Sequence, residues 1–162
     1  MKNYLLRMLS FVFAAVLTGM LMGGPALGQD ADSAKVARVL NESKLTFTKQ
    51  SETVWVTPFE GKNLKDIPIV MSVGGDILVV FTLVAQKKEV NMTPALMLKL
   101  LAANQEFDRV KVGIDKDGDI FTRIDIPLRV LDAAELRTSA EQTSAVADQI
   151  FAYVQPSLVK KK

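Results

Sequence analysis

The sequence contains no cysteine and no histidine among its 162 residues. Without cysteine the chain has no disulfide, no thiol nucleophile, no zinc–thiolate site and no iron–sulfur cluster. Without histidine it lacks the most common general base, the most common transition-metal ligand and the usual charge switch near neutral pH. These two absences remove most familiar catalytic and metal-site chemistries. We therefore predict no catalytic residue, no metal site, no cofactor and no small-molecule substrate.

The first 28 residues have the pattern of a secretory signal peptide. A positively charged start precedes an apolar stretch, 5–24, and the small residues Ala26 and Gly28 stand at the spacing that a signal peptidase accepts. We expect cleavage after Gly28 and a periplasmic or secreted protein. The alternative is a retained membrane anchor, because the apolar stretch is nearly long enough to span a bilayer. No cysteine follows the cut, which excludes a lipoprotein anchor.

The rest of the chain is predicted to be a single domain, 29–156, followed by a basic tail, 157–162. Removing 28 residues from 162 leaves 134, which is enough for one hydrophobic core. Of the 20 Lys and Arg residues, Lys2 and Arg7 belong to the signal, so 18 remain against 18 Asp and Glu. A domain without excess positive charge lacks the basic face that nucleic acid requires. We expect no nucleic-acid partner.

The apolar periodicity predicts an α+β fold with an antiparallel sheet of about five strands and helices packed on one face. Ser33 is expected to cap a first helix, 33–43. Thr93 should cap a second helix with Pro94 in its first turn, and Asp132 should cap the last helix. Alternating apolar residues predict strands within the segments 44–60, 67–73, 77–85, 108–115 and 118–128.

The clearest hairpin joins 67–73 to 77–85, and Gly74 and Gly75 are expected to occupy the two central positions of its turn. The strand 77–85 is apolar throughout except for Thr82. Such a strand should be covered on both faces, by helices on one side and by another layer or subunit on the other.

The acidic stretch Asp115-Lys116-Asp117-Gly118-Asp119 raises the question of a calcium site. An EF-hand loop needs glycine at its sixth position and glutamate at its twelfth. Counting from Asp115, glycine is fourth and the twelfth residue is Ile126, which cannot bind a cation. The stretch instead fits a turn between two strands, with Gly118 in the left-handed conformation.

Two further interpretations concern possible function. Asp115, Asp117 and Asp125 are the candidates for an envelope hydrolase that uses carboxylates alone. Trp55 is either a core residue or an exposed anchor. With Val79 and Phe81 of the apolar strand, it is a candidate partner-binding residue.

The second half of the chain resembles the YbjN family. The resemblance is a Leu-rich helix ending near an Asn, a strand, an acidic turn with Gly, a strand ending in Pro and a closing helix. The matching positions are Leu100, Asn104, Asp117, Gly118, Asp125, Pro127 and Leu131. The resemblance implies the fold of the class I type III secretion chaperones, with the order α-β-β-β-α-β-β-α. It implies no catalytic residue.

The family resemblance and the apolar strand indicate the same kind of function. We expect an exported, non-enzymatic protein-binding or chaperone-like module, acting as a homodimer or binding a peptide along a sheet edge. The alternatives are the carboxylate hydrolase and a regulatory protein held at the membrane by an uncleaved signal.

Overall fold

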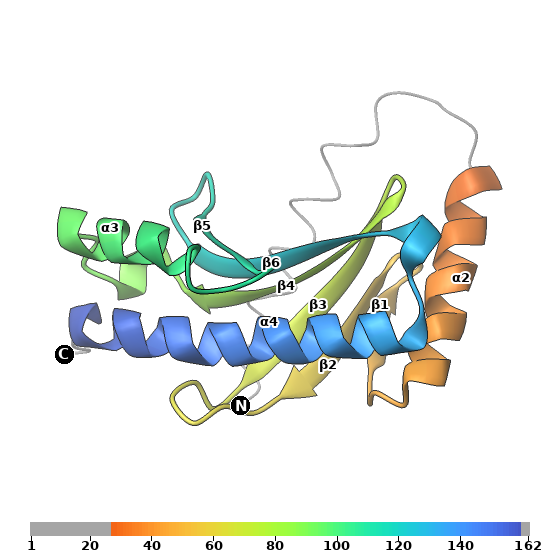
Figure 1. Cartoon of the computed structure of the whole chain (residues 1–162), viewed down its shortest axis with the longest axis horizontal. Helices are drawn as coiled ribbons and strands as arrows, with labels where there is room; N and C mark the ends of the chain where they lie inside the picture. Colours follow the sequence, from red (N-terminus) through yellow and green to blue (C-terminus); the bar gives the residue numbers. More distant parts are fainter. Residues whose placement is uncertain (1–26, 160–162) are drawn as a thin grey trace.

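A six-stranded antiparallel sheet forms the centre of the structure, a computed structural model that describes residues 27–159 (Figure 1). The strands lie in the order β1-β2-β3-β4-β6-β5. This confirms the predicted α+β fold, with one strand more than the five expected. The bounds are β1 Thr48–Ser51, β2 Val54–Phe59, β3 Ile67–Gly74, β4 Ile77–Ala85, β5 Lys111–Ile114 and β6 Ile120–Pro127.

The extra strand arises because the segment 44–60 is not one continuous strand. It turns back at Glu52, so that β1 pairs with β2 and Lys49 lies opposite Trp55. All four residues of β1 are exposed. The sequence contains no glycine or proline at this turn. The alternation of apolar and polar residues over 44–60 therefore predicted a single strand.

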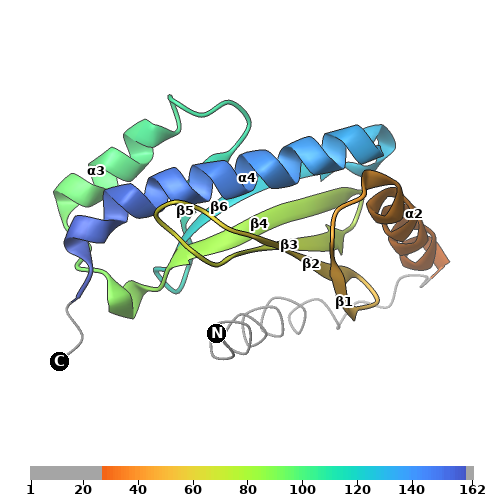
Figure 2. The same cartoon turned by 90° about the horizontal axis from the view of Figure 1, so that it is seen from below.

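Between residues 27 and 159 three α-helices pack against the sheet: α2 Leu27–Ser43, α3 Pro94–Ala103 and α4 Ala133–Val154. The long helix α4 packs along one face, on β3, β4 and β6. Figures 1 and 2 show α2 crossing one end of the sheet and α3 at the other end, beside β5 and the end of α4. None of the helices between residues 27 and 159 has the length and apolar character needed to cross a bilayer.

Two of the predicted helix starts are confirmed. The Leu96 amide donates to Thr93 Oγ1 at 3.2 Å, with Pro94 at the first helical position of α3. The Glu135 amide donates to Asp132 Oδ1 at 2.8 Å at the start of α4. These side chains accept bonds from amides that have no partner inside the helix.

Two predictions about local structure were wrong: the residue at which the first helix begins and the residues at the centre of the β3–β4 turn. Helix α2 already includes Leu27, so Ser33 is buried within the helix rather than capping it. The β3–β4 turn is centred on Gly75 and Asp76, because Gly74 still pairs with Ile77. Of these two residues only Gly75 has a positive φ, +62°, and a type II′ turn requires a positive φ at its first central residue. Apart from Leu27 and Gly28, the predicted signal peptide lies outside the described residues.

The acidic stretch is a hairpin turn, as predicted. The Gly118 amide donates to the Asp115 carbonyl at 3.0 Å, and Gly118 has a φ of +87°. The Asp115 carboxylate accepts the amides of Asp117 and Asp119, both at 2.9 Å. Within residues 27–159 no group of three or more acidic side chains is placed to hold a metal ion.

Candidate protein-binding surfaces

The two faces of β4 have different surroundings although both are apolar. Leu78, Val80 and Val84 are buried beneath α4, with at most 4% of their surface exposed. The alternate residues, Val79 and Phe81 among them, point to the other side and are half-buried. The helix side of the sheet is therefore a closed core, and the other side is the first candidate surface.

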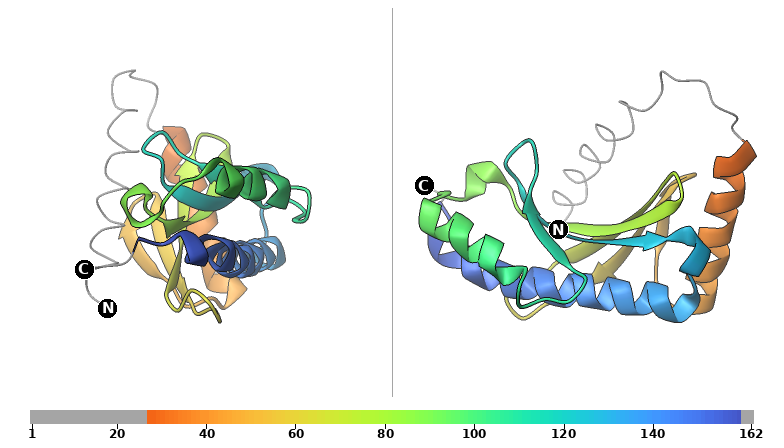
Figure 3. Two further views of the ribbon diagram at one scale, coloured as in Figure 1. Left: turned by 90° about the vertical axis from the view of Figure 1, so that its left-hand side faces the viewer. Right: turned by 45° about the horizontal axis from the view of Figure 1, so that its top comes forward.

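Strand register defines this second surface, which we call the open face. Phe81 of β4 lies between Val70 of β3 and Arg123 of β6, and Val79 lies between Ser72 and Asp125. No described helix lies over these strands on this side (Figures 2 and 3). Val70 is buried and the remaining members are half-buried. The open face comprises Val56, Val70, Val79, Phe81, Leu83, Phe121, Arg123 and Asp125.

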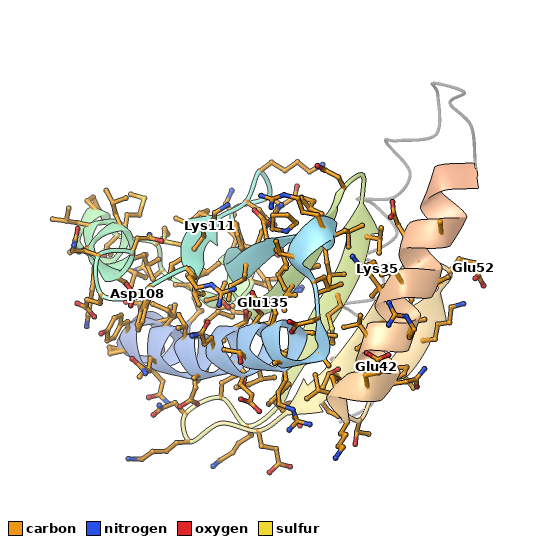
Figure 4. The ribbon with its side chains drawn as sticks, turned by 45° about the vertical axis from the view of Figure 1, so that its right-hand side comes forward. Lys35, Glu42, Glu52, Asp108, Lys111 and Glu135 are labelled. Carbon is orange, nitrogen blue, oxygen red and sulfur yellow. The ribbon has the colours of Figure 1, made fainter. Side chains whose placement is uncertain are left out.

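A small ion-pair cluster borders the apolar part of the open face. Lys111 Nζ of β5 lies 2.7 Å from Asp125 Oδ2, and Arg123 Nε donates to Asp125 Oδ1. Burial raises the pKa of Asp125, but the hydrogen bonds from Lys111 and Arg123 outweigh it and leave that pKa lowered. Lys111 sits at the β5 edge, away from α4 (Figure 4). Two cations share one carboxylate, so this border carries net positive charge.

The three candidate partner-binding residues do not form one surface. Trp55 is 1% exposed and lies opposite Met71, which in turn lies opposite Val80 on the helix side. In this conformation Trp55 is a core residue, and only Val79 and Phe81 lie on the open face.

The two edges of the sheet differ in their free backbone groups. At the β5 edge, the Asn104 side chain accepts from the Val112 amide at 2.8 Å and donates to the Val112 carbonyl at 3.1 Å. A side-chain amide thus takes the place of a neighbouring strand. At the other edge, β1 is exposed along its whole length. An added strand would find free partners at β1 and not at Val112.

Helix α3 carries a second apolar surface, which the sequence analysis missed. Leu96, Leu100 and Ala103 are buried, but Met97, Leu98 and Leu101 are 42%, 68% and 69% exposed. We call these last three residues the α3 stripe. The signal in the sequence is that every residue of α3 except Lys99 is apolar, and a helix that is apolar on nearly every side is typically covered on nearly every side.

The hydrolase interpretation requires a carboxyl group whose pKa is raised. Among Asp115, Asp117 and Asp125, the first is bound by the amides of its own turn and the last has a lowered pKa. A shallow cleft of about 430 Å³ lies elsewhere, between α4 and the β2–β3 loop, and includes Glu60, Glu141 and Asp148. Asp148 is the least exposed carboxylate of this cleft, and it accepts hydrogen bonds from the β2–β3 loop.

Asp148 of α4 holds the β2–β3 loop in place. Its Oδ1 accepts the amides of Asn63 at 2.6 Å and Leu64 at 2.8 Å, and its Oδ2 accepts the Asn63 side chain at 3.0 Å. Burial raises the pKa of Asp148, but these hydrogen bonds outweigh it and the pKa is lowered. A Cβ at Gly61 would lie 2.2 Å from Asp148 Oδ1, so only glycine fits there. This arrangement stabilises the fold and leaves Asp148 without a free oxygen for acid catalysis.

Comparison with known proteins gives a family and a fold. A family model described as "YbjN: Putative bacterial sensory transduction regulator" matches residues 32–156. No curated protein matches the chain. The fold is similar to a chain in the heterodimeric ExoU–SpcU complex from the type III secretion system of Pseudomonas aeruginosa. That match has a TM-score of 0.56 and 14% identity, and it covers 74% of this chain and 98% of that one.

Two further solved structures give the same result. A chain of the ExsC–ExsE complex matches with a TM-score of 0.55 and 12% identity, covering 80% of this chain and 98% of that one. YbjN from E. coli, described as "a putative transcription regulator", matches with a TM-score of 0.52 and 15% identity, covering 80% and 96%. The TM-scores show that the fold is shared. At sequence identities this low, the matches show nothing about shared partners.

Asp148→Asn should lower the free energy of unfolding at pH 7 by about 1–2 kcal/mol, because the charge on the hydrogen-bonded acceptor is lost. The folded-state pKa of Asp148 lies below its ordinary value of 3.8, so its contribution is present above that value and fades as the pH falls further. The deficit of the variant should therefore shrink below about pH 4. Urea unfolding at pH 7 and near pH 3 measures both effects.

Glu141→Gln, on the same helix and beside the same cleft, is the control. Its carboxylate has only a 4.0 Å contact with Arg137, so it should change stability by a few tenths of a kcal/mol. Equal losses for the two variants would show that Asp148 does not hold the loop.

Proposed function

We propose that this chain, which belongs to the YbjN family, is an exported, non-enzymatic protein-binding or chaperone-like module that acts as a homodimer. The observation that carries the proposal is the open face. It presents half-buried apolar side chains, including Val79 and Phe81, on β2, β4 and β6, with no helix of residues 27–159 over them. An apolar surface of this kind is typical of a site that binds another chain.

The chemistry of the open face favours an extended protein segment as its ligand. Side chains on a strand alternate, so every second residue of a bound segment would reach Val79 and Phe81. The cationic border formed by Lys111 and Arg123 favours a segment that also carries an acidic residue. The exposed backbone of β1 gives a bound segment a second means of attachment.

The solved structures with this fold support the proposal. Besides the ExoU–SpcU complex, the HopA1–SchA chaperone–effector complex contains a chain that matches with a TM-score of 0.53. Each of these complexes holds one protein bound to another. The fold is thus known in complexes in which a protein chain is the ligand, and we extend that use to this chain.

Phe81→Ser should weaken the binding of an extended peptide by about tenfold or more, because one of the two phenylalanine contacts of the open face is removed. The probe is a labelled synthetic peptide of alternating apolar and polar residues with one Asp, and binding is measured by fluorescence anisotropy on the processed protein. Phe151→Ser is the control, since Phe151 is also a half-buried phenylalanine but belongs to α4.

Both variants should lose some stability, and only Phe81→Ser should lose peptide binding. The proposal fails if the wild-type protein does not bind the peptide, or if Phe81→Ser binds it as tightly as the wild type does.

The export part of the proposal has its own test. Mass spectrometry of the protein from its native cells should find a chain that begins at Gln29, because Ala26 and Gly28 fit the recognition of signal peptidase. Cleavage after Gly28 would remove only the first two residues of α2. A chain that begins at Met1 would favour the membrane-tethered alternative.

A further inference from the structure

Helix α2 runs past one end of the sheet and begins on the side of the open face. At its far end, the Ser43 carbonyl accepts a hydrogen bond from the Arg137 side chain of α4. The start of α2 lies on the side of the sheet away from α4 (Figures 2 and 3). The part of the chain that precedes α2, residues 1–26, therefore enters the domain on the side where no helix of residues 27–159 covers the strands.

The contacts of α2 place this entry point next to the apolar part of the open face. Lys35 Nζ of α2 donates to the Leu128 carbonyl, and the Leu128 amide donates to the Asp76 carbonyl at 2.8 Å. Asp76 directly precedes β4, and Val79 follows after about 10 Å of extended strand. A segment that leaves the start of α2 thus has Val79 and then Phe81 within reach.

The segment nearest to this entry point is the apolar stretch 5–24. Only residues 25–26 separate it from α2, and Arg7 is its only ionisable residue. A helix of this length is about 30 Å long and about 10 Å wide. The open face extends about 13 Å along β4 from Val79 to Leu83, and about 14 Å across the strands from β2 to β6. The stretch 5–24 is therefore long enough and apolar enough to cover the open face.

We infer that the open face binds the chain's own predicted export signal, residues 5–24, for as long as that signal is attached. The inference rests on the proposed function and adds its regulation, because the attached signal occupies the site of the partner segment. A second copy or a foreign peptide reaches this face from solution, at its own concentration. The attached stretch has an effective concentration in the millimolar range, because the connection to α2 is short. It therefore excludes other ligands until cleavage after Gly28 removes it.

Processing frees the open face and leaves the core intact. The buried apolar residues of the described domain begin at Val36 and end at Val154, so cleavage after Gly28 removes none of them. Protein binding is then confined to processed chains. On the proposed export, those are the chains that have reached the periplasm or the medium.

Peptide binding by the unprocessed chain is the first test. The full chain, residues 1–162, is made by cell-free synthesis without membranes, so that the signal stays attached. It should bind the labelled peptide used for Phe81→Ser at least about tenfold more weakly than the chain that begins at Gln29, because the attached stretch competes for the same face. Fluorescence anisotropy on the two forms gives the ratio of their dissociation constants.

Charged substitutions inside the stretch should restore peptide binding to the full chain. At helical spacing Val12 and Val16 share one side, and the polar residues Ser10 and Thr18 lie on the other. Val12→Asp with Val16→Asp should strengthen peptide binding by at least about fivefold, because an unpaired carboxylate is costly to bury in an apolar contact. Ser10→Asp with Thr18→Asp adds the same charge on the other side, and this control should bind the peptide as weakly as the unsubstituted full chain.

A photoreactive phenylalanine analogue at position 81 tests the contact itself. In the full chain it should form bonds to residues within 5–24 of the same chain, which mass spectrometry locates. The product should keep the mass of a monomer on a denaturing gel. The same analogue in place of Phe151, a half-buried residue of α4, should form no bond to that stretch.

The two readouts separate this inference from the proposed function. A full chain that binds the peptide as tightly as the processed chain overturns the inference and leaves the open face as a binding site for other chains. A crosslink from position 81 that joins two chains, or that never reaches 5–24, does the same. A processed chain that does not bind the peptide overturns the proposed function, and the crosslink in the full chain then still decides the inference.

Discussion

The packing of α4 on one face of the sheet is the interaction on which the rest of the structure depends. Leu136, Ala140, Ala147 and Ile150 of this helix are fully buried, and they cover β3, β4 and β6 along the length of the domain. Alanines at the contact let the helix lie close to the strands. A single helix can cover one face only, and α2 and α3 lie at the two ends of the sheet. On the opposite face, no helix of residues 27–159 covers the apolar side chains.

Much of the fold was predictable from the sequence, because caps and turns are local. Thr93, Asp132 and Gly118 were each assigned correctly from their neighbours in the chain. The turn at Glu52 was missed because it contains no glycine or proline, and Ser33 was misplaced because the helix continues N-terminal to it. The candidate site was harder to predict for a different reason. Both faces of β4 are apolar, so no pattern distinguishes Val79 from Leu78, and only the position of α4 does. The sequence likewise left open whether Trp55 is buried or exposed, because its environment is set by tertiary packing.

The polar groups of the domain are used mainly to hold it together. Asp148 fixes a loop, Asp125 binds Lys111 and Arg123, and Asn104 closes part of the β5 edge. The surfaces that remain are apolar or are backbone edges: the open face, the α3 stripe and β1. Surfaces of these kinds recognise protein chains. The absence of cysteine and histidine from the sequence is in keeping with such a role.

The most direct test of the account is the solvent exposure of methyl groups along β4. A neutral paramagnetic agent dissolved with the processed protein broadens the NMR signals of exposed methyl groups. The account predicts strong broadening for Val79 and Leu83 and little for Leu78, Val80 and Val84, which are at most 4% exposed beneath α4. Equal protection of both sets would contradict it, because the open face would then be covered by the protein itself and unavailable to a partner.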